Sequence, residues 1–302
     1  GWARRVSLEL LLIRRAFVLV FVPCFFWGRG VGGGKLISDD VPAPLLGCLR
    51  CFVASFPLML MARKHFGVKI DRADWKYFAG VGVMGYFLTI FLIQLGISLT
   101  GASMASLVNS VTPVGVTIFA ALHLKEKITP TKVLCLVLAL VGTFVITTGA
   151  TGQGEMAGIL VVLAAVVTWS VASVFMRQLT AKYPPVLVTT VGMAFSLIGH
   201  IPVGLFTAAT QDVLIDGRVV LVVLYLGFFG SGVAQFTWVK CLSALPASTC
   251  SLFYPLQPVF SALLGALLLK EKFTPAFFAG LLLISIDVAL STWETKRTSP
   301  DR

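Results

Sequence analysis

The stretch Leu124-Lys-Glu-Lys-Ile-Thr-Pro130 occurs almost unchanged a second time, as Leu269-Lys-Glu-Lys-Phe-Thr-Pro275, and this pair decides the fold. The second copy begins 145 residues after the first. The same offset relates Ala102-Ser103 to Ala247-Ser248 and Pro113-Val114 to Pro258-Val259. Weaker matches earlier in the chain pair Trp27 with Trp169, Lys35 with Arg177, and Pro42 with Pro184. Self-similarity at a fixed offset indicates that the chain contains two copies of one unit.

Composition places both copies in a lipid bilayer. Of the 302 residues, 57% are hydrophobic and 12% are charged, and the mean hydropathy is +0.94. A soluble domain has roughly a quarter of its residues charged. A helix of about 20 apolar residues spans a bilayer, and ten segments qualify: 16–36, 42–62, 76–98, 101–122, 131–149, 156–178, 185–208, 218–241, 246–268 and 274–292. We therefore expect an all-α integral membrane protein with ten transmembrane helices.

Basic residues predict how these helices are oriented. The net charge is +11, and the basic residues gather in short links at the membrane edges, such as Arg14-Arg15 and Arg63-Lys64. Because cytoplasmic links are enriched in Lys and Arg, we expect both termini, residues 1–15 and 294–302, in the cytoplasm of a multi-pass protein of the cell (plasma or inner) membrane. Topology accounts for the charge, so no nucleic-acid partner is expected.

Each copy holds five of the expected spans. Residues 16–149 form the first repeat and residues 150–293 the second. An odd number of spans makes the second copy enter the membrane upside down. Inverted repeats are the architecture of many secondary transporters, whose solute site lies near the bilayer midplane between the halves.

Several ordered motifs accompany the repeat. Trp27-Gly28 is followed by Lys35, and Leu49-Arg50 stands in the second span. The fourth span of the first copy carries Ala102-Ser103, Pro113, Glu126 and Thr129, and the second copy carries Ala247-Ser248, Pro258, Glu271 and Thr274. With these features the chain resembles the drug/metabolite transporter superfamily, specifically its EamA type. The resemblance implies a ten-helix basket around a central cavity and relatives that move amino acids and similar metabolites, often outward.

The expected function is that of a secondary transporter of a small-molecule solute, an exporter of amino acids or related compounds that works by alternating access. A carrier of an anionic phosphorylated or nucleotide-linked solute is the alternative. A membrane-embedded enzyme or a scaffold is the alternative of another class. An enzyme would need a nucleophile with its base, paired carboxylates or a metal set, and the spans hold one carboxylate and one isolated histidine, Asp287 and His200. We therefore expect no catalytic residue, metal or cofactor; a homodimer stays open.

Two arginines are candidate anchors for an anionic group. Arg29 and Arg50 lie at similar depth on adjacent spans, roughly 10–12 Å below the outer end at 1.5 Å per residue. A charge within a span costs about 2.5–3.5 kcal/mol on insertion scales and so marks a functional site or a snorkelling side chain. The alternative partners are Asp39 and Asp40. The glycines between Gly28 and Lys35 do not form a nucleotide-binding loop, because no strand precedes them.

Other polar and aromatic residues are candidate solute contacts. Asn109 and Thr112 precede Pro113, and Tyr254 and Gln257 occupy the equivalent places before Pro258. A proline frees a backbone carbonyl and can kink its helix, so polar groups beside it can reach a solute; interhelical hydrogen bonding is the alternative. Weaker candidates are Gln94, Gln235, Trp27, Trp169 and Trp238.

One carboxyl and two charged turns complete the set. Asp287 is the candidate for proton coupling, since a carboxyl in lipid is expected to have a raised pKa; a capped or snorkelling acid is the alternative. The two Lys-Glu-Lys turns sit at helix ends, where a structural role is expected. Thr129-Pro130 is a predicted N-cap followed by proline in the first turn.

Overall fold

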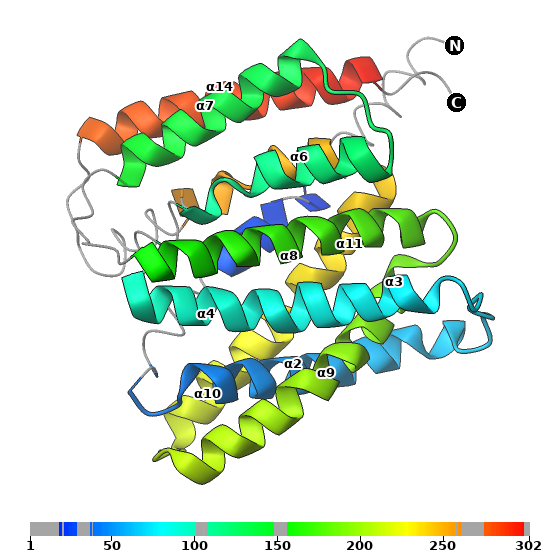
Figure 1. Cartoon of the computed structure of the whole chain (residues 1–302), viewed down its shortest axis with the longest axis vertical. Coiled ribbons are helices and arrows are strands. Elements are labelled where there is room, and N and C mark those ends of the chain that lie inside the picture. Colours follow the sequence, from blue (N-terminus) through cyan, green and yellow to red (C-terminus); the bar gives the residue numbers. More distant parts are fainter. Residues whose placement is uncertain are drawn as a thin grey trace.

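The computed structural model describes residues 18–19, 21–28, 37, 39–100, 105, 108–147, 156–257, 259–260 and 275–298. Every regular element within these ranges is a helix (Figure 1). The elements are α2 Ala43–Ala62, η1 Arg63–His65, α3 Trp75–Gly80, η2 Val81–Leu88, α4 Thr89–Thr100, α6 Thr112–His123, α7 Pro130–Thr147, α8 Met156–Thr180, α9 Pro185–Thr210, α10 Gly217–Tyr225, η3 Leu226–Val233, α11 Ala234–Ala244, α12 Ala247–Ser251 and α14 Pro275–Thr298.

Five helices are long and apolar enough to cross a membrane: Ala43–His65, Trp75–Leu99, Met156–Thr180, Pro185–Thr210 and Gly217–Ala244. Each begins and ends within a few residues of a predicted span. Shorter apolar helices are Thr112–His123, Pro130–Gly142 and Phe278–Leu290. Large apolar side chains such as Phe56, Leu205 and Leu221 are more than half exposed, as lipid-facing residues are. The chain is thus an all-helical membrane protein.

Two spans are interrupted by π-helical segments that we did not predict. Val81–Leu88 lies between α3 and α4, and Leu226–Val233 lies between α10 and α11. Each segment has eight residues, and the offset between them is the repeat offset. π-Helical turns inside α-helices are rare and concentrate at functional sites. Their recurrence at equivalent places makes them a property of the repeated unit.

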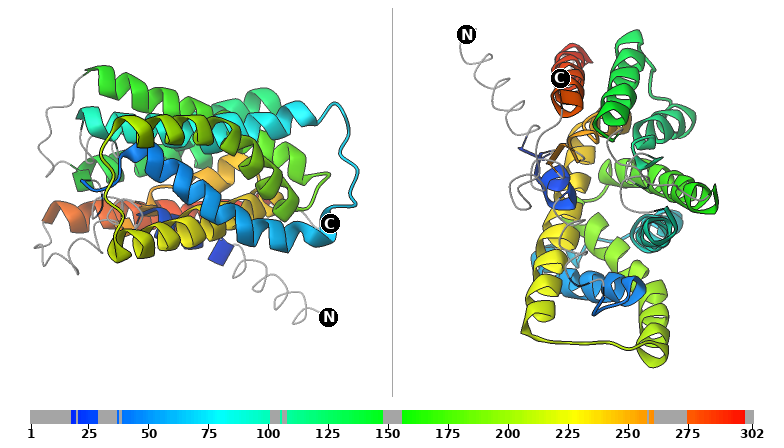
Figure 2. Two further views of the ribbon diagram at one scale, coloured as in Figure 1. Left: turned by 90° about the horizontal axis from the view of Figure 1, so that it is seen from below. Right: turned by 90° about the vertical axis from the view of Figure 1, so that its left-hand side faces the viewer.

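Helices of the two halves pack against each other throughout the molecule. α2 packs on α9, α7 packs on α14, α2 contacts η3, and α9 contacts η2. Figure 1 shows that α7 and α14 run in opposite directions, as do α2 and α9. Figure 2 gives two further views of the bundle, with α7 and α14 together at one side. The second helix of each half therefore rests on the π-helical segment of the other half.

The predicted spans 101–122 and 246–268 are not continuous helices where the structure describes them. α6 begins only at Thr112, after a turn at residues 110–111, and α12 ends at Ser251, before a turn over residues 252–255. Each turn lies shortly before one of the repeat-equivalent prolines, Pro113 and Pro258, of which Pro258 lies outside the described residues. Proline cannot donate a backbone hydrogen bond, so these prolines favour an interruption rather than a kink.

Loops at one end of the bundle tie the halves together. The Tyr183 hydroxyl donates to the Asp74 carboxylate at 2.8 Å, and Lys182 Nζ lies 3.1 Å from the same oxygen. The hydrogen bond from Tyr183 is the main cause that keeps the pKa of Asp74 below its ordinary value, and Lys182 lowers this pKa further. At the start of α7, the Lys132 N–H donates to Thr129 Oγ1 at 3.2 Å, which confirms the predicted N-cap.

Candidate functional site

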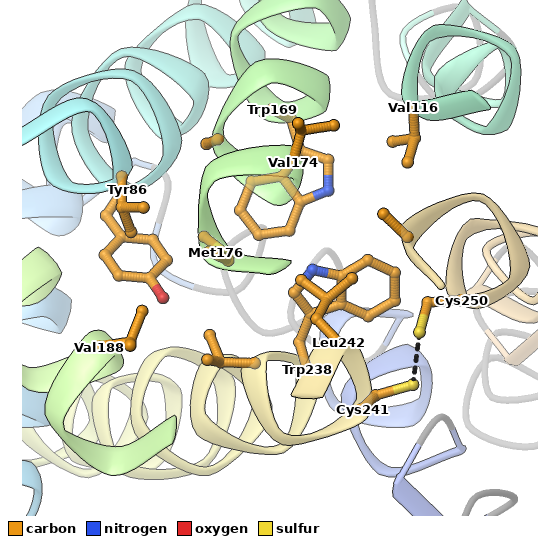
Figure 3. Packing of buried hydrophobic residues seen from close by; sticks show 14 of the residues in the cluster. Tyr86, Val116, Trp169, Val174, Met176, Val188, Trp238, Cys241, Leu242 and Cys250 are labelled. Atoms are coloured by element: carbon orange, nitrogen blue, oxygen red, sulfur yellow. Dashed lines mark hydrogen bonds between the residues drawn. The ribbon is translucent and has the colours of Figure 1, made fainter. Parts of the chain in front are cut away.

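Four of the predicted aromatic residues form one cluster inside the bundle. Trp27 comes from helical residues 21–28, Trp169 from α8, Trp238 from α11 and Tyr254 from the turn before Pro258. The ring centroid of Trp27 lies 5.6 Å from that of Trp169, 5.7 Å from that of Trp238 and 5.9 Å from that of Tyr254. Figure 3 shows the Trp169 and Trp238 rings facing each other, with centroids 6.2 Å apart. The interruption at residues 252–255 thus delivers a side chain to the cluster.

Buried polar atoms around the cluster lack partners among the described residues. They are Trp169 Nε1, Trp238 Nε1, Gln235 Oε1 and Ser173 Oγ. A buried polar group without a hydrogen bond costs about 1–3 kcal/mol, so such groups call for an explanation. Two indole donors and one amide acceptor could bind the polar groups of a small molecule.

Arg50 lies next to this cluster, on α2. Its Nε donates to Ser231 Oγ at 3.2 Å, while the Trp27 indole Nε1 donates to the neighbouring Gly230 carbonyl at 3.1 Å. Both acceptors belong to η3. No carboxylate of the described residues lies within 4.0 Å of the Arg50 guanidinium, since the three ion pairs found there involve other cations. A partly buried guanidinium without a counter-ion can bind an anionic group.

The remaining predicted residues are placed as follows. The Thr112 hydroxyl donates to the Asn109 carbonyl at 2.6 Å, so these two residues bond to each other at the interruption before α6. Gln257 and Gln94 are partly buried. Asp287 is buried where α14 packs on α7, and its backbone carbonyl accepts from Cys135 at 3.8 Å. Asp287 therefore belongs to a different helix pair from the aromatic cluster. Arg29 lies outside the described residues.

Sequence reasoning missed Gly230 and Ser231. A signal was present, because Gly82 and Gly85 recur as Gly227 and Gly230 at the repeat offset. Paired glycines in the third span of each half indicate close backbone approach. Their location in the π-helical segments could not be read from this spacing alone.

The first Lys-Glu-Lys turn has a structural role that joins the halves. The Glu126 carboxylate accepts from the backbone N–H groups of Ala247 at 2.8 Å and Ser248 at 3.1 Å, and also from the Ser248 hydroxyl. Lys132 Nζ donates to the same hydroxyl at 2.7 Å. The Glu and Ala-Ser elements of the repeated motif thus meet across the halves. The second turn, at Glu271, lies outside the described residues.

Within the described ranges, no three His, Cys, Asp or Glu side chains gather to hold a metal ion. The six cysteines are all free, and Cys241 Sγ lies 2.9 Å from Cys250 Sγ (Figure 3). These sulfurs pack beside the aromatic cluster.

The chain matches the model of the EamA-like transporter family twice, over residues 14–148 and 156–293. It is 26% identical over 269 residues to an uncharacterized transporter of Archaeoglobus fulgidus, which covers 88% of this chain and 94% of that protein. It is 24% identical over 278 residues to the uncharacterized transporter YetK of Bacillus subtilis, which covers 88% of this chain and 83% of the relative. A solved crystal structure with 23% identity shares the fold at a TM-score of 0.80, over 94% of this chain and 99% of the other. The chain belongs to the EamA-like transporter family of multi-pass membrane proteins.

Proposed function

We propose that the chain is a secondary transporter that exports amino acids or related small metabolites by alternating access. The observation that carries the proposal is the aromatic cluster of Trp27, Trp169, Trp238 and Tyr254, which lies beside the Arg50 guanidinium; within the described part of the chain no carboxylate pairs with Arg50. An amino acid offers a carboxylate for Arg50 and an ammonium group that is attracted to aromatic faces.

Alternating access between two inverted halves is supported by the opposite directions of α7 and α14 and of α2 and α9. In such carriers the solute site lies between the repeats, beside discontinuous helices. The interruption at residues 252–255 reaches across to the first half, because Tyr254 contacts Trp27. We assign 16–149 and 150–293 as the two moving halves, with both termini on the cytoplasmic side.

A carrier of an anionic phosphorylated or nucleotide-linked solute is the second candidate. It is favoured by Arg50, since a guanidinium binds phosphate as well as carboxylate in a forked geometry. The two candidates differ in what the aromatic cluster would contact: an ammonium group or side chain in the first, a sugar or base in the second. Proton coupling through Asp287 would apply to either.

The test is solute flux in proteoliposomes. Purified protein is reconstituted with radiolabelled amino acids, each tested singly, and in parallel with radiolabelled sugar phosphates and nucleotide sugars. We expect amino-acid exchange well above that of empty liposomes. Exchange of the phosphorylated solutes alone would favour the second candidate. Folded protein that exchanges neither class would rule out both.

A further inference from the structure

Two consecutive residues of η3 accept hydrogen bonds from two side chains of the candidate site, Trp27 and Arg50. Gly230 offers its carbonyl to the Trp27 indole, and Ser231 offers its hydroxyl to Arg50 Nε. A π-helical turn displaces the backbone from the regular i→i−4 pattern, which makes carbonyls available to other donors. A single short segment therefore determines where both side chains point.

We propose that Ser231 is the positioning residue for Arg50, and that η3 is the element that orients the solute site. This rests on the proposed transport function. Arginine carries five N–H donors in a planar fork. The bond from Nε to Ser231 restrains the direction of the guanidinium and leaves its two Nη groups to make a forked contact with a carboxylate or phosphate.

The absence of a side chain at Gly230 supports this assignment. A Cβ built on Gly230 would lie 3.4 Å from Arg50 Nη2, and no other side chain of the described residues would lie within 4 Å of it, apart from those of its chain neighbours. The guanidinium thus lies against the bare backbone of η3. Because the Arg50 stem is long and flexible, its direction depends on the bond to Ser231 rather than on tight packing around Gly230.

The first arm of the test is transport kinetics of Ser231→Ala in proteoliposomes, with each radiolabelled amino acid that the wild-type protein exchanges. Loss of the bond that orients the guanidinium should weaken its contact with the solute carboxylate, so we expect KM to rise about ten-fold while the maximal rate stays near that of the wild type. Ser231→Thr, which keeps the hydroxyl, should restore KM. Ser196→Ala removes a buried hydroxyl that bonds within its own helix, at 2.7 Å to the Met193 carbonyl, and should leave KM unchanged.

The second arm needs no solute, so that it separates this inference from the transport proposal. In nitrogen-15-labelled protein, the Nε–H of Arg50 should exchange slowly with solvent in the wild type and in Ser231→Thr, and quickly in Ser231→Ala. Equal exchange in all three proteins, or an unchanged KM in Ser231→Ala, would overturn the positioning role. Slow exchange in a protein that moves no solute would instead count against the transport proposal alone.

The two halves also meet at the end of the bundle where α6 ends and α12 begins. Several contacts join the halves there, among them Glu126 with Ala247 and Ser248, Asp74 with Tyr183, and His123 Nε2 with Gln178 Oε1 at 2.6 Å. Of these, Glu126 makes the most bonds, and the two backbone N–H groups that it accepts from stand at the start of a helix, where a carboxylate is favoured.

We infer that Glu126 is a latch that keeps this end of the carrier closed and must release when the end opens. Alternating access requires the halves to separate at one end at a time, and the Glu126 bonds cross that boundary. The neighbouring Cys250, on α12, is fully buried and serves as a native reporter of opening.

The latch is tested by the rate at which a water-soluble maleimide labels Cys250, measured by peptide mass spectrometry in proteoliposomes. We expect Glu126→Gln to label several-fold faster than the wild type. Lys127→Gln is the matched control, because its side chain is exposed and only its backbone carbonyl is used, by Lys132. Equal labelling of Glu126→Gln and the control would overturn the latch.

Discussion

The two spans that contain π-helical segments, Trp75–Leu99 and Gly217–Ala244, share a backbone arrangement but differ in the side chains that bond to it. In both, a residue at the equivalent position accepts a hydrogen bond from the second helix of the other half. His200 Nε2 lies 2.9 Å from the Tyr86 carbonyl, which can only accept, and Arg50 Nε donates to the Ser231 hydroxyl. The first contact is imidazole to backbone; the second brings a cation to the aromatic cluster.

The glycines show the same difference. A Cβ on Gly82 of η2 would lie 2.4 Å from the Gly192 carbonyl oxygen, and one on Gly85 would lie 2.7 Å from Ala172 Cβ. In η3, a Cβ on Gly227 would lie 2.6 Å from Val53 Cβ, whereas the contact that the described residues offer to a Cβ on Gly230 is Arg50 Nη2 at 3.4 Å. The first glycine of each segment is therefore enclosed by helix packing, whereas the second faces Ala172 in η2 and the Arg50 guanidinium in η3. The repeat thus supplies the same backbone geometry twice, and the candidate site draws mainly on the copy in η3.

The largest expected effect is on stability, from Gly82→Ala. The new Cβ would meet backbone oxygen rather than a flexible side chain, so the helices must move apart, and we expect a loss of about 3 kcal/mol. Thermal unfolding in detergent measures it. Gly217→Ala is the control, because a Cβ there would have no neighbour within 4 Å among the residues that the structure describes. Matching unfolding midpoints for the two variants would mean that η2 is not packed as described.

Gly230→Ala should have the opposite profile. Alanine is favoured over glycine within a helix by about 0.5–1 kcal/mol, which offsets the mild contact with Arg50, so the unfolding midpoint should change little. Displacement of the guanidinium should weaken solute binding about five-fold, equivalent to roughly 1 kcal/mol, as read from KM in the flux assay. A lowered unfolding midpoint with an unchanged KM would contradict this, because it would give η3 the packing role that we assign to η2.

A smaller effect is expected where the η2-containing span begins. Tyr183→Phe removes the hydroxyl that donates to Asp74 and should cost about 1 kcal/mol. Asp74 has a lowered pKa, so its stabilisation is present above the ordinary carboxyl pKa and is lost as pH falls through the lowered value. In Tyr183→Phe this pKa lies closer to its ordinary value, so the loss of stability on acidification should be smaller than in the wild type and should be complete at a higher pH. Unfolding midpoints measured from pH 7 down to about pH 3 test this, and superimposable acid profiles would contradict it.

The smallest effect is expected where the η3-containing span begins. There Arg218, at the start of the span, forms an ion pair with Asp40 of the other half. At the η2-containing span the signs are exchanged, because the residue at its start is the acid Asp74 and the partner is Lys182. The Arg218 side chain is 59% exposed, and exposed ion pairs contribute about 0–1 kcal/mol. Asp40→Asn should therefore shift the unfolding midpoint less than Tyr183→Phe does. A larger shift would show that this pair holds the halves together more firmly than its exposure implies.

Much of the fold was predictable, because the internal repeat and the apolar segments can be read directly from the sequence. The spans and the Thr129 cap follow from composition and local chemistry. The π-helical segments and the interruptions before Pro113 and Pro258 did not follow, because they depend on contacts between halves that are distant in sequence. Glu126 was correctly expected to be structural, but its partner Ser248 required the arrangement of the two halves.

The site was predictable in part. Trp27, Trp169, Trp238 and Tyr254 were selected as polar or aromatic residues in spans, and they form one cluster. Asp287 was selected by the same rule, and it lies on a different helix pair. Intramembrane polarity identifies candidates but does not say which of them share a site. Ser231 was overlooked because a single serine in an apolar helix carries no signal without its partner, Arg50.

A solute site organised around η3 is tested most directly by the solute flux through Arg50→Gln compared with that through His200→Gln, each corrected for the amount of folded protein. These side chains make the equivalent hydrogen bonds to η3 and η2. We predict that Arg50→Gln abolishes exchange of radiolabelled amino acids while the protein stays folded, and that His200→Gln keeps most of it. Full exchange by Arg50→Gln, or equal loss in both variants, would contradict a solute site organised around η3.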